Sequence, residues 1–274
     1  MKITVILSTY NNPEWLQKTL WGYGAQTHED FDIVIADDGS GDETKQLIEK
    51  FSAESNLKIT HCWHPDNGFQ KCQILNLATI AATGDYLIFT DGDCIPLPNF
   101  VEVHATHAEK GHFISGGYCK LPMELSKLIS KEDINSGRAF DSTWLKKHGL
   151  TSFSSRLKIS TSSPWDKLAD NLTTTKPTWN GCNASTWKAD IFFVNGHNEE
   201  MQYGGEDREM GERLFNLGHK AKQLRHRAVL IHLDHARAYV NQEALDKNRA
   251  IRQSTIASKS TWSSNGILKQ PQRS

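Results

Sequence analysis

Cysteine is scarce in this 274-residue chain and follows no pattern. The five cysteines are Cys62, Cys72, Cys94, Cys119 and Cys182. They are odd in number and contain no C-x-x-C pair, which argues against a disulfide framework. We therefore expect a reduced, cytoplasmic protein.

Long hydrophobic runs and an excess of one charge are also missing. No stretch approaches the roughly 18 apolar residues of a membrane span. The first apolar run, residues 3–7, is too short for a signal peptide because Ser8 and Thr9 follow it. The formal net charge is −1, so no nucleic-acid partner is indicated. With 38% hydrophobic and 23% charged residues, the composition is that of a globular protein.

What the sequence does contain is an alternation of apolar runs and helical patterns in residues 1–93. We expect strands at residues 3–7, 31–36, 57–63 and 86–93, and helices at residues 14–25, 43–51 and 70–82. This alternation predicts βαβ units with right-handed crossovers. The expected fold class is therefore α/β with a parallel sheet.

Two carboxylates end the fourth expected strand, in the sequence Thr90-Asp91-Gly92-Asp93. Open α/β sheets bind ligands at the carboxyl ends of their strands, and side chains at i and i+2 of an extended segment point the same way. Gly92 would let a ligand approach the backbone closely. Such a pair suits Mg²⁺ or Mn²⁺ shared with substrate phosphates. An ordinary acidic loop is the alternative.

The sequence changes character after an expected helix at residues 99–109 and an expected strand at residues 112–118. Residues 120–176 are rich in Ser and Thr. We expect a partly helical, mobile insertion that acts as a lid or an acceptor-binding segment, with an inter-domain linker as the alternative. A last strand is expected at residues 228–233, and the polar tail from Asn241 would form a helix on the domain and then a loose end.

A helix is expected from residue 206 to residue 217, directly after Gly204-Gly205. Its inward face would carry Met210, Leu214 and Leu217. Asp207 lies three residues before Met210 on that face, so it would point inward at the positive end of the helix dipole. Simple compensation of that dipole by Glu206 and Asp207 is the alternative.

Taken in order, five motifs resemble glycosyltransferase family 2, a family of inverting enzymes with the GT-A fold. The motifs are Ile6-Leu7-Ser8-Thr9-Tyr10-Asn11, Ile35-Ala36-Asp37-Asp38-Gly39-Ser40, Asp66-Asn67-Gly68-Phe69 through Asn76, Thr90-Asp91-Gly92-Asp93 and Gly204-Gly205-Glu206-Asp207. Residues 179–207, with His232 beyond them, also resemble the galactosyltransferase-like C-terminal portion of chondroitin polymerases. The resemblance covers about residues 1–118 and 178–235.

This resemblance implies a Rossmann-like, doubly wound, mostly parallel sheet with a smaller acceptor-binding part. It divides the chain into a nucleotide-sugar-binding half at residues 1–118 and a tail at residues 241–274. Between them lies an acceptor-binding half of the same domain, residues 119–240, which contains the mobile insertion at about residues 120–176.

The resemblance also implies a nucleoside-diphosphate sugar donor, most often linked to uridine. The donor would be held by Thr9, Tyr10, Asn11, Asp38, Gly68, Lys71, Asn76, Asp91, Gly92 and Asp93. Asp93 would bind Mn²⁺ or Mg²⁺ with His232, and His235 is the alternative ligand. An imidazole ligand favours Mn²⁺. Where many members have Ala-Arg-Asn this chain has Ile74-Leu75-Asn76, and Lys71 or Gln70 would replace the phosphate contact of that Arg.

For the transfer itself, the resemblance implies that Asp207 is the general base for an acceptor hydroxyl. A single displacement would invert the anomeric configuration. The acceptor would contact Glu206, Trp179, Asn180 and Gly205. Trp179 and Trp187 are candidates either for stacking on a sugar or for the core.

The partners that the resemblance implies are a nucleotide-sugar donor and a glycan or glycolipid acceptor in surface polysaccharide or lipopolysaccharide synthesis. The diffuse basic charge of the tail leaves contact with the inner face of the membrane open, and the oligomeric state is open as well.

Two other functions fit parts of the sequence. A metal-dependent sugar nucleotidyltransferase would share the sheet and the acidic site, but residues 8–12 contain neither Gly nor Lys or Arg for a phosphate loop. A non-catalytic sugar- or nucleotide-binding module would be expected to lack one acidic element. Here Asp38, Asp91, Asp93, Asp207 and His232 are all present.

Overall fold

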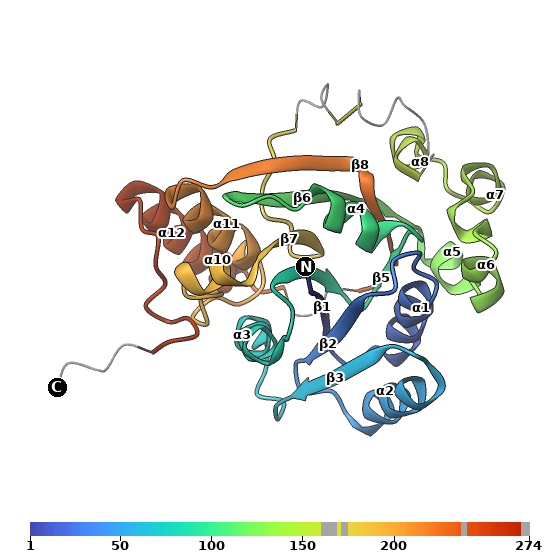
Figure 1. Ribbon diagram of the computed structural model, residues 1–274, viewed down its shortest axis with the longest axis horizontal. Coiled ribbons are helices and arrows are strands. Elements are labelled where there is room, and N and C mark those ends of the chain that lie inside the picture. The colour runs from blue at the N-terminus through green and yellow to red at the C-terminus, as the bar shows by residue number, and fades with distance from the viewer. Residues whose placement is uncertain (160–168, 171–174, 237–239, 270–274) are drawn as a thin grey trace.

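The computed structural model describes residues 1–159, 169–170, 175–236 and 240–269 of the chain. Its first half contains β1 (Ile3–Thr9), α1 (Pro13–Gly24), β2 (Phe31–Asp37), α2 (Asp42–Glu54), β3 (Lys58–Trp63), α3 (Lys71–Ala81), β4 (Tyr86–Asp91), β5 (Cys94–Pro96), α4 (Phe100–His107) and β6 (His112–Lys120). The second half contains α5 (Met123–Leu128), α6 (Lys131–Asn135), η1 (Arg138–Phe140), α7 (Ser142–Lys147), α8 (Phe153–Ile159), β7 (Asn183–Trp187), α10 (Lys188–Phe193), α11 (Glu206–Asn216), β8 (Lys220–His232) and α12 (Gln242–Ser258). Figure 1 shows their arrangement.

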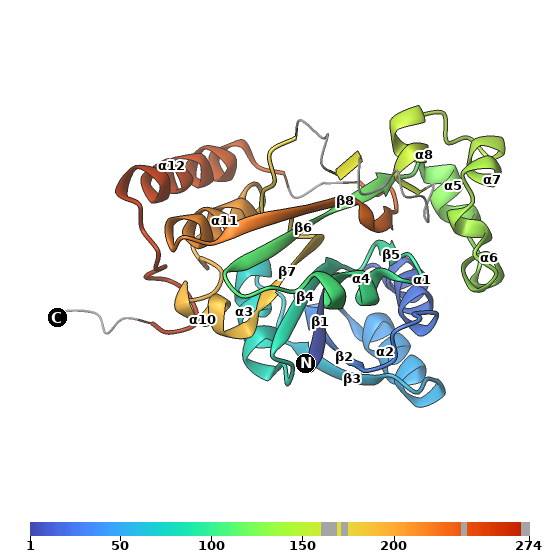
Figure 2. The ribbon, with the colours of Figure 1, turned by 45° about the horizontal axis from the view of Figure 1, so that its top comes forward.

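One curled sheet runs through the molecule in the order β3-β2-β1-β4-β7-β6-β8-β5 (Figures 1 and 2). The strands β3, β2, β1 and β4 pair in parallel, as the alternation of strands and helices predicts. Beyond β4 the pairing is mixed, because β7 is antiparallel to both β4 and β6 whereas β8 is parallel to β6. The prediction of an α/β, mostly parallel sheet is confirmed.

Alternating side chains of the central strands enter two separate hydrophobic cores, one on each face of the sheet. On β1, Val5 and Leu7 pack with residues of α1, α2 and α4, whereas Ile6 packs with residues of α3, α10 and α11. This is the period-two alternation of an extended strand. Both faces of the strands are covered, which accounts for their uninterrupted apolar sequence.

The described part of the insertion, residues 120–159, is helical and packed. It forms a third core in which Leu125, Ile134 and Leu145 contact residues of β8 and α1. The buried ammonium of Lys18, on α1, donates hydrogen bonds to the carbonyls of Ser126 and Lys127 at the end of α5. These contacts anchor α5–α8 to the domain. The expectation of a mobile insertion also covers residues 160–168 and 171–174, which lie outside the described residues.

Three features differ from the sequence-based expectations. β8 begins at Lys220 rather than at residue 228. The short strands β5 and β7 were not expected, because each is specified by pairing with a distant strand rather than by a local pattern. Leu217 follows α11 and is 38% exposed, so it does not belong to the buried face that Met210 and Leu214 form.

A buried ion pair joins α11 to its surroundings. The Arg213 guanidinium donates to both carboxylate oxygens of Glu209 and to the carbonyl of Val194, and Thr255 on α12 donates to the same carboxylate at 2.9 Å. Arg213 is fully buried and Glu209 is 2% exposed. The expected helix in the tail is therefore present, and α12 packs against α11.

We predict that Arg213→Met destabilises the fold by about 3–5 kcal/mol, because Glu209 keeps a buried charge that has lost its partner. Urea unfolding followed by circular dichroism measures the change. Arg249→Met is the matched control, since its pair with Asp246 is largely exposed and should contribute less than about 1 kcal/mol. Equal effects of the two changes would contradict the prediction.

Candidate active site

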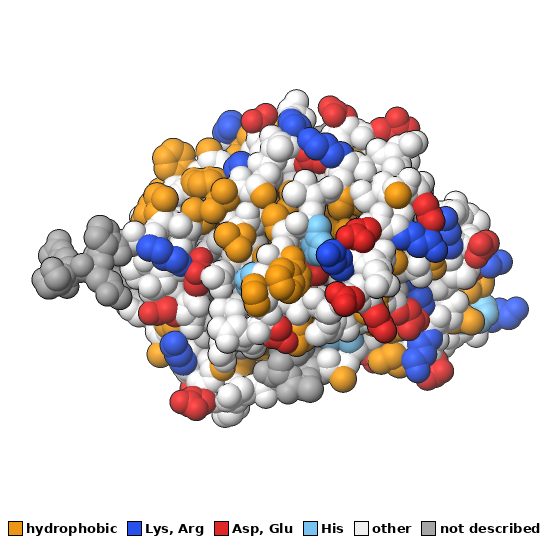
Figure 3. Space-filling model, turned by 90° about the horizontal axis from the view of Figure 1, so that it is seen from below, with side chains coloured by type: hydrophobic (Ala, Val, Ile, Leu, Met, Phe, Trp, Pro, Cys, Tyr) orange, Lys and Arg blue, Asp and Glu red, His pale blue; other side chains and the backbone are white. Residues whose placement is uncertain are grey.

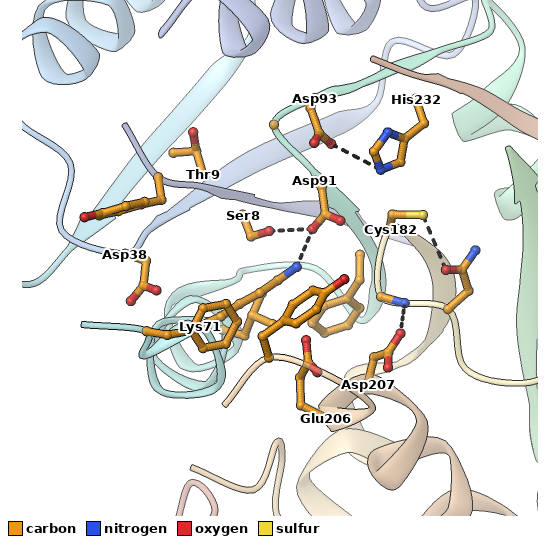
Figure 4. Close-up of a pocket in the computed structure, with 18 of the residues that line it drawn as sticks. Ser8, Thr9, Asp38, Lys71, Asp91, Asp93, Cys182, Glu206, Asp207 and His232 are labelled. Carbon is orange, nitrogen blue, oxygen red and sulfur yellow. Dashed lines mark hydrogen bonds and ion pairs between the residues drawn. The ribbon is translucent and has the colours of Figure 1, made fainter. Parts of the chain in front are cut away.

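A cavity of about 650 Å³ lies at the carboxyl ends of β1, β2 and β4 (Figure 4). Among the residues predicted from the sequence, those that line it are Thr9, Tyr10, Asp38, Gly68, Lys71, Asp91, Gly92, Asp93, Trp179, Asn180, Glu206, Asp207 and His232, together with the alternative ligand His235. The acidic pair, the imidazole and the helix-opening carboxylates thus share one cavity. The volume is within the range of small-molecule and cofactor sites.

Asp91 ends β4 and is held from two sides. Its Oδ1 accepts hydrogen bonds from Ser8 Oγ and from Lys71 Nζ, both at 2.6 Å. Burial by itself lowers the pKa of Lys71, but Asp91, Glu206 and Asp207 outweigh it and raise the pKa above its ordinary value. Lys71 is therefore a fixed cation among carboxylates, at the start of α3.

Gly92 lies where β4 leaves the sheet, and it packs against the end of β1. Its N–H donates to the Ser8 carbonyl at 2.7 Å. A Cβ at this position would lie 3.1 Å from both the Ser8 oxygen and Thr9 Oγ1, so a larger residue would push β1 and β4 apart. A small residue at this position therefore suits the close packing of the two strand ends.

The turn at Gly92 brings Asp93 against two histidines that follow it by about 140 residues. Cys94 on β5 pairs with His232 on β8, and the Leu233 N–H donates to the Asp93 carbonyl at 2.8 Å. Asp93 Oδ1 is 4.0 Å from His232 Nε2, and Oδ2 is 3.0 Å from His235 Nε2. Burial would raise the pKa of Asp93, but the hydrogen bond from His235 and the charges of both histidines lower it to about 2.

The donor atoms around Asp93 fit a divalent cation. His232 Nδ1 is 2.8 Å from the Leu233 carbonyl, and because a carbonyl only accepts, this nitrogen carries the proton. In its neutral form the ring therefore presents the Nε2 lone pair toward Asp93, the arrangement in which histidine ligates metals. Ligand atoms of Asp93, Cys94 and His232 all lie within 4.8 Å of one another.

At the opposite end of the cavity, Asp38 follows β2. Its two oxygens accept from His64 Nε2 at 2.8 Å and from the Gln70 N–H at 3.1 Å. Burial raises the pKa of Asp38, although both hydrogen bonds act in the opposite direction. Tyr10 donates to Asp66 at 2.8 Å and is 48% exposed, so its ring is available to a planar ligand.

Two carboxylates open α11 and face the same cavity (Figure 4). Gly204 and Gly205 precede them with φ values of 113° and 94°, a conformation that strongly favours glycine. Glu206 accepts from the Gly204 N–H at 2.7 Å, and Asp207 accepts from the Gly181 N–H at 3.0 Å. Burial and the neighbouring Asp207 raise the pKa of Glu206 to about 7.

The loop before these carboxylates is held by α12. Asn248 is fully buried, and its amide donates to the carbonyls of Gln202, Tyr203 and Gly204 at 2.7, 3.3 and 3.3 Å. Nothing in the sequence marked this tail asparagine, because its partners lie about 45 residues earlier in the chain.

Four predicted site residues have other positions or surroundings than expected. Asn11 accepts from the Gly41 N–H and braces the loop after β2. Asn76 is buried in α3, where it bonds the backbone of His197. Gly205 is the N-cap of α11. These three do not line the cavity. Trp179 borders it but is 1% exposed and packs on Phe89, so the core role applies rather than sugar stacking.

The cavity also contains residues that the sequence did not single out. Ser8, Tyr118, Lys120, Cys182 and His197 all line it. Ser8 could have been found, because it is the first polar residue at the end of a strand. His197 is 1% exposed, and burial lowers its pKa to about 3. Its place in a turn after an apolar helix gave no signal.

Comparison with known proteins agrees with this arrangement. The family model described as "Glycosyl transferase family 2" matches residues 4–150, and the model described as "N-terminal domain of galactosyltransferase" matches residues 171–236. The chain belongs to glycosyltransferase family 2. The resemblance that the five motifs indicated is thereby confirmed.

Curated relatives share most of this chain but extend beyond it. Validoxylamine A glucosyltransferase of Streptomyces hygroscopicus subsp. jinggangensis is 28% identical over 235 residues, which is 79% of this chain and 52% of that protein. Chondroitin synthase of Escherichia coli is 26% identical over 244 residues, 79% of this chain and 32% of that protein. The chain thus spans about half the length of the first of these relatives and a third of the second.

Solved structures of glycosyltransferases have the same fold. Staphylococcus aureus TarS 1–349 in complex with UDP-GlcNAc has a TM-score of 0.62 at 18% identity, covering 94% of this chain and 69% of that one. The mannosyltransferase PcManGT of Pyrobaculum calidifontis, in complex with GDP-Man and Mn²⁺, has a TM-score of 0.58 at 17% identity, covering 87% and 58%. The predicted GT-A fold is confirmed.

Within residues 1–159, 169–170, 175–236 and 240–269, no helix combines the length and apolarity that crossing a bilayer requires. Acidic, basic and apolar side chains are interspersed on the face shown in Figure 3.

We predict that Glu206 makes stability fall as the pH rises from about 4.5 to about 7. The unfolded chain releases this proton near 4.5 and the folded chain near 7, so between these values the folded state binds more protons. Across this range, the free energy of unfolding of the wild type should fall by on the order of 1–3 kcal/mol relative to that of Glu206→Gln. Urea unfolding at pH 4.5, 6 and 7.5 measures this change. The same pH dependence of the unfolding free energy in both proteins would contradict the raised pKa.

Proposed function

We propose that this chain transfers a sugar from a uridine-diphosphate donor to a hydroxyl of a glycan acceptor, with inversion and with the help of a divalent metal. The observation that carries the proposal is the single cavity shared by Asp91 and Asp93, by His232 and by Glu206 and Asp207. Membership of glycosyltransferase family 2 supports the reaction class. The structure of TarS with UDP-GlcNAc supports the choice of uridine.

In this proposal the donor lies along the carboxyl edge of the parallel strands. Asp38 accepts from the base or ribose, and the exposed ring of Tyr10 stacks on the base. Lys71 is the fixed cation beside Asp91 and neutralises part of the diphosphate charge. This role replaces the contact of the arginine that is absent at Leu75.

Asp93 and His232 would hold Mn²⁺ or Mg²⁺, with His235 as the alternative ligand. When bound, such a cation supplies Lewis-acid stabilisation of the leaving diphosphate. The protein's own part is to fix the ligands: the Leu233 carbonyl orients the His232 ring, and the Leu233 N–H fixes the Asp93 backbone.

On the acceptor side, Asp207 takes the proton of the attacking hydroxyl. Two backbone N–H groups, of Gly181 and Arg208, hold its carboxylate at 3.0 and 2.7 Å. Glu206 hydrogen-bonds the acceptor. With its pKa near 7, Glu206 is also the second candidate for the base, because a base works best when its pKa is near the working pH.

Two further functions are less well supported. A nucleotidyltransferase needs a basic, glycine-rich phosphate loop, and the β1–α1 loop instead offers Ser8, Thr9 and Tyr10 to the cavity. A binding module would not need the carboxylate pair of α11. Relatives such as chondroitin synthase support a surface polysaccharide or lipopolysaccharide as the acceptor, and we propose that the chain works on the cytoplasmic side, in contact with the membrane that carries it.

Asp93→Ala should weaken Mn²⁺-dependent binding of UDP by at least about tenfold, since even partners outside the first coordination sphere are worth about 10–100-fold. Isothermal titration calorimetry with and without Mn²⁺ measures the effect, with the exposed Asp246→Ala as control. Unchanged Mn²⁺-dependent binding of UDP to Asp93→Ala would show that Asp93 does not hold the metal. His232→Ala should act like Asp93→Ala, and if only His235→Ala does so, His235 is the ligand.

Asp207→Asn should keep UDP binding and lower kcat by about 10²–10⁴-fold, the usual contribution of a general base. Glu206→Gln is the comparison, because it removes the neighbouring carboxylate at the same helix end. Product formation from UDP-sugars with glycan acceptors measures turnover. If Glu206→Gln loses turnover and Asp207→Asn does not, the base is Glu206.

A further inference from the structure

Two cysteine thiols lie beside Asp91, and the proposed transfer uses neither. Cys94 begins β5 and is fully buried, whereas Cys182 precedes β7, is 8% exposed and lines the cavity. The ligand atoms of Asp91, Cys94 and Cys182 all lie within 4.8 Å of one another. Figure 4 shows Cys182 on the wall of the cavity next to Asp91.

The chemistry of this trio differs from that of the Asp93 site. Two sulfur atoms and one carboxylate oxygen suit Zn²⁺ and similar thiophilic cations, whereas Mg²⁺ and Mn²⁺ prefer oxygen ligands. Four-coordinate zinc needs ligand atoms about 3.5–4 Å apart, as bond lengths of about 2.0–2.3 Å imply. The three ligand atoms lie within 4.8 Å of one another, a limit about 1 Å above that range.

The thiols already point toward oxygen acceptors rather than only into apolar surroundings. Cys182 donates to Asn180 Oδ1 at 3.3 Å, and Cys94 donates to Asp93 Oδ1 at 3.3 Å. A purely structural role as small core residues explains the burial of both. It does not account for two sulfurs and a carboxylate oxygen lying within 4.8 Å of one another beside the cavity.

We propose that Asp91, Cys94 and Cys182 form a second cation site that selects Zn²⁺-like metals and that blocks the donor site when it is filled. Binding replaces the two S–H protons, which pass to the solvent, by two metal–sulfur bonds. The cation then competes with Lys71 for Asp91 Oδ1, which Lys71 now contacts at 2.6 Å. The binding step is independent of the proposed function, whereas the block of the donor site rests on it.

Binding is tested with Co²⁺, whose thiolate complexes absorb in the near ultraviolet and so report sulfur ligation directly. The full chain, kept reduced with a phosphine, should develop this absorption on titration with Co²⁺ alone and lose it when Zn²⁺ is added. Cys182→Ser should lack the absorption, and Cys62→Ser, which changes a thiol on β3, should keep it. Cys182→Ala serves as a second variant, and circular dichroism checks that each variant is folded.

No absorption in the wild type, or an absorption in both Cys182 variants equal to that of the wild type, would overturn the site. Because this measurement needs neither donor nor turnover, its failure leaves the proposed transfer untouched. In the second arm, stoichiometric Zn²⁺ should weaken calorimetric binding of UDP by more than tenfold in the wild type and in Cys62→Ser. Unchanged UDP binding in zinc-loaded wild type would overturn the block of the donor site.

Discussion

A short antiparallel pairing between β5 and β8 determines the geometry of the whole site. Only three residue pairs form it, and one of them joins Cys94 to His232. Because β5 follows Asp93 directly, this pairing fixes the acidic turn of the parallel half against the histidines at the end of the mixed half. Without it, the two halves of the sheet would present their polar ends at separate places. The site therefore depends on pairing between strands of both halves rather than on either sequence half alone.

The second constraint is electrostatic. Asp91, Asp93, Glu206 and Asp207 all face one cavity of limited volume, and like charges so close raise one another's proton affinity. Each of three carboxylates has a different stabilising partner. Lys71 contacts Asp91, the histidines contact Asp93, and backbone N–H groups donate to Asp207. Glu206 accepts the backbone N–H of Gly204, yet burial and the neighbouring Asp207 still raise its pKa to about 7. The arrangement is one in which cations and hydroxyl donors are favoured ligands.

The sequence predicts those parts of the fold and site that depend on local patterns, and it misses those that depend on contacts between distant segments. The parallel half was predictable because its elements follow local patterns, in which strands rich in apolar and β-branched residues alternate with helical periods. Asp91, Asp93 and Asp207 were predictable because they stand at element ends within family motifs. β5, β7 and the start of β8 were not, since their pairing partners lie far away in the chain. Asn76 and Trp179 were given ligand roles because the sequence shows residue type but not direction.

The same reasoning explains why the tail contributes to the site although no motif covers it. The loop before α11 contains two glycines with positive φ. Because glycine adds freedom to the unfolded chain, this loop needs contacts from outside to fix it. α12 supplies them through Asn248 on the loop carbonyls and Thr255 on Glu209. Both partners are fully or nearly buried, so their hydrogen bonds are made in a region where an unmade bond costs about 1–3 kcal/mol. Contacts from α12 thus help to fix α11 and the loop before it, while Glu206 and Asp207 line the cavity.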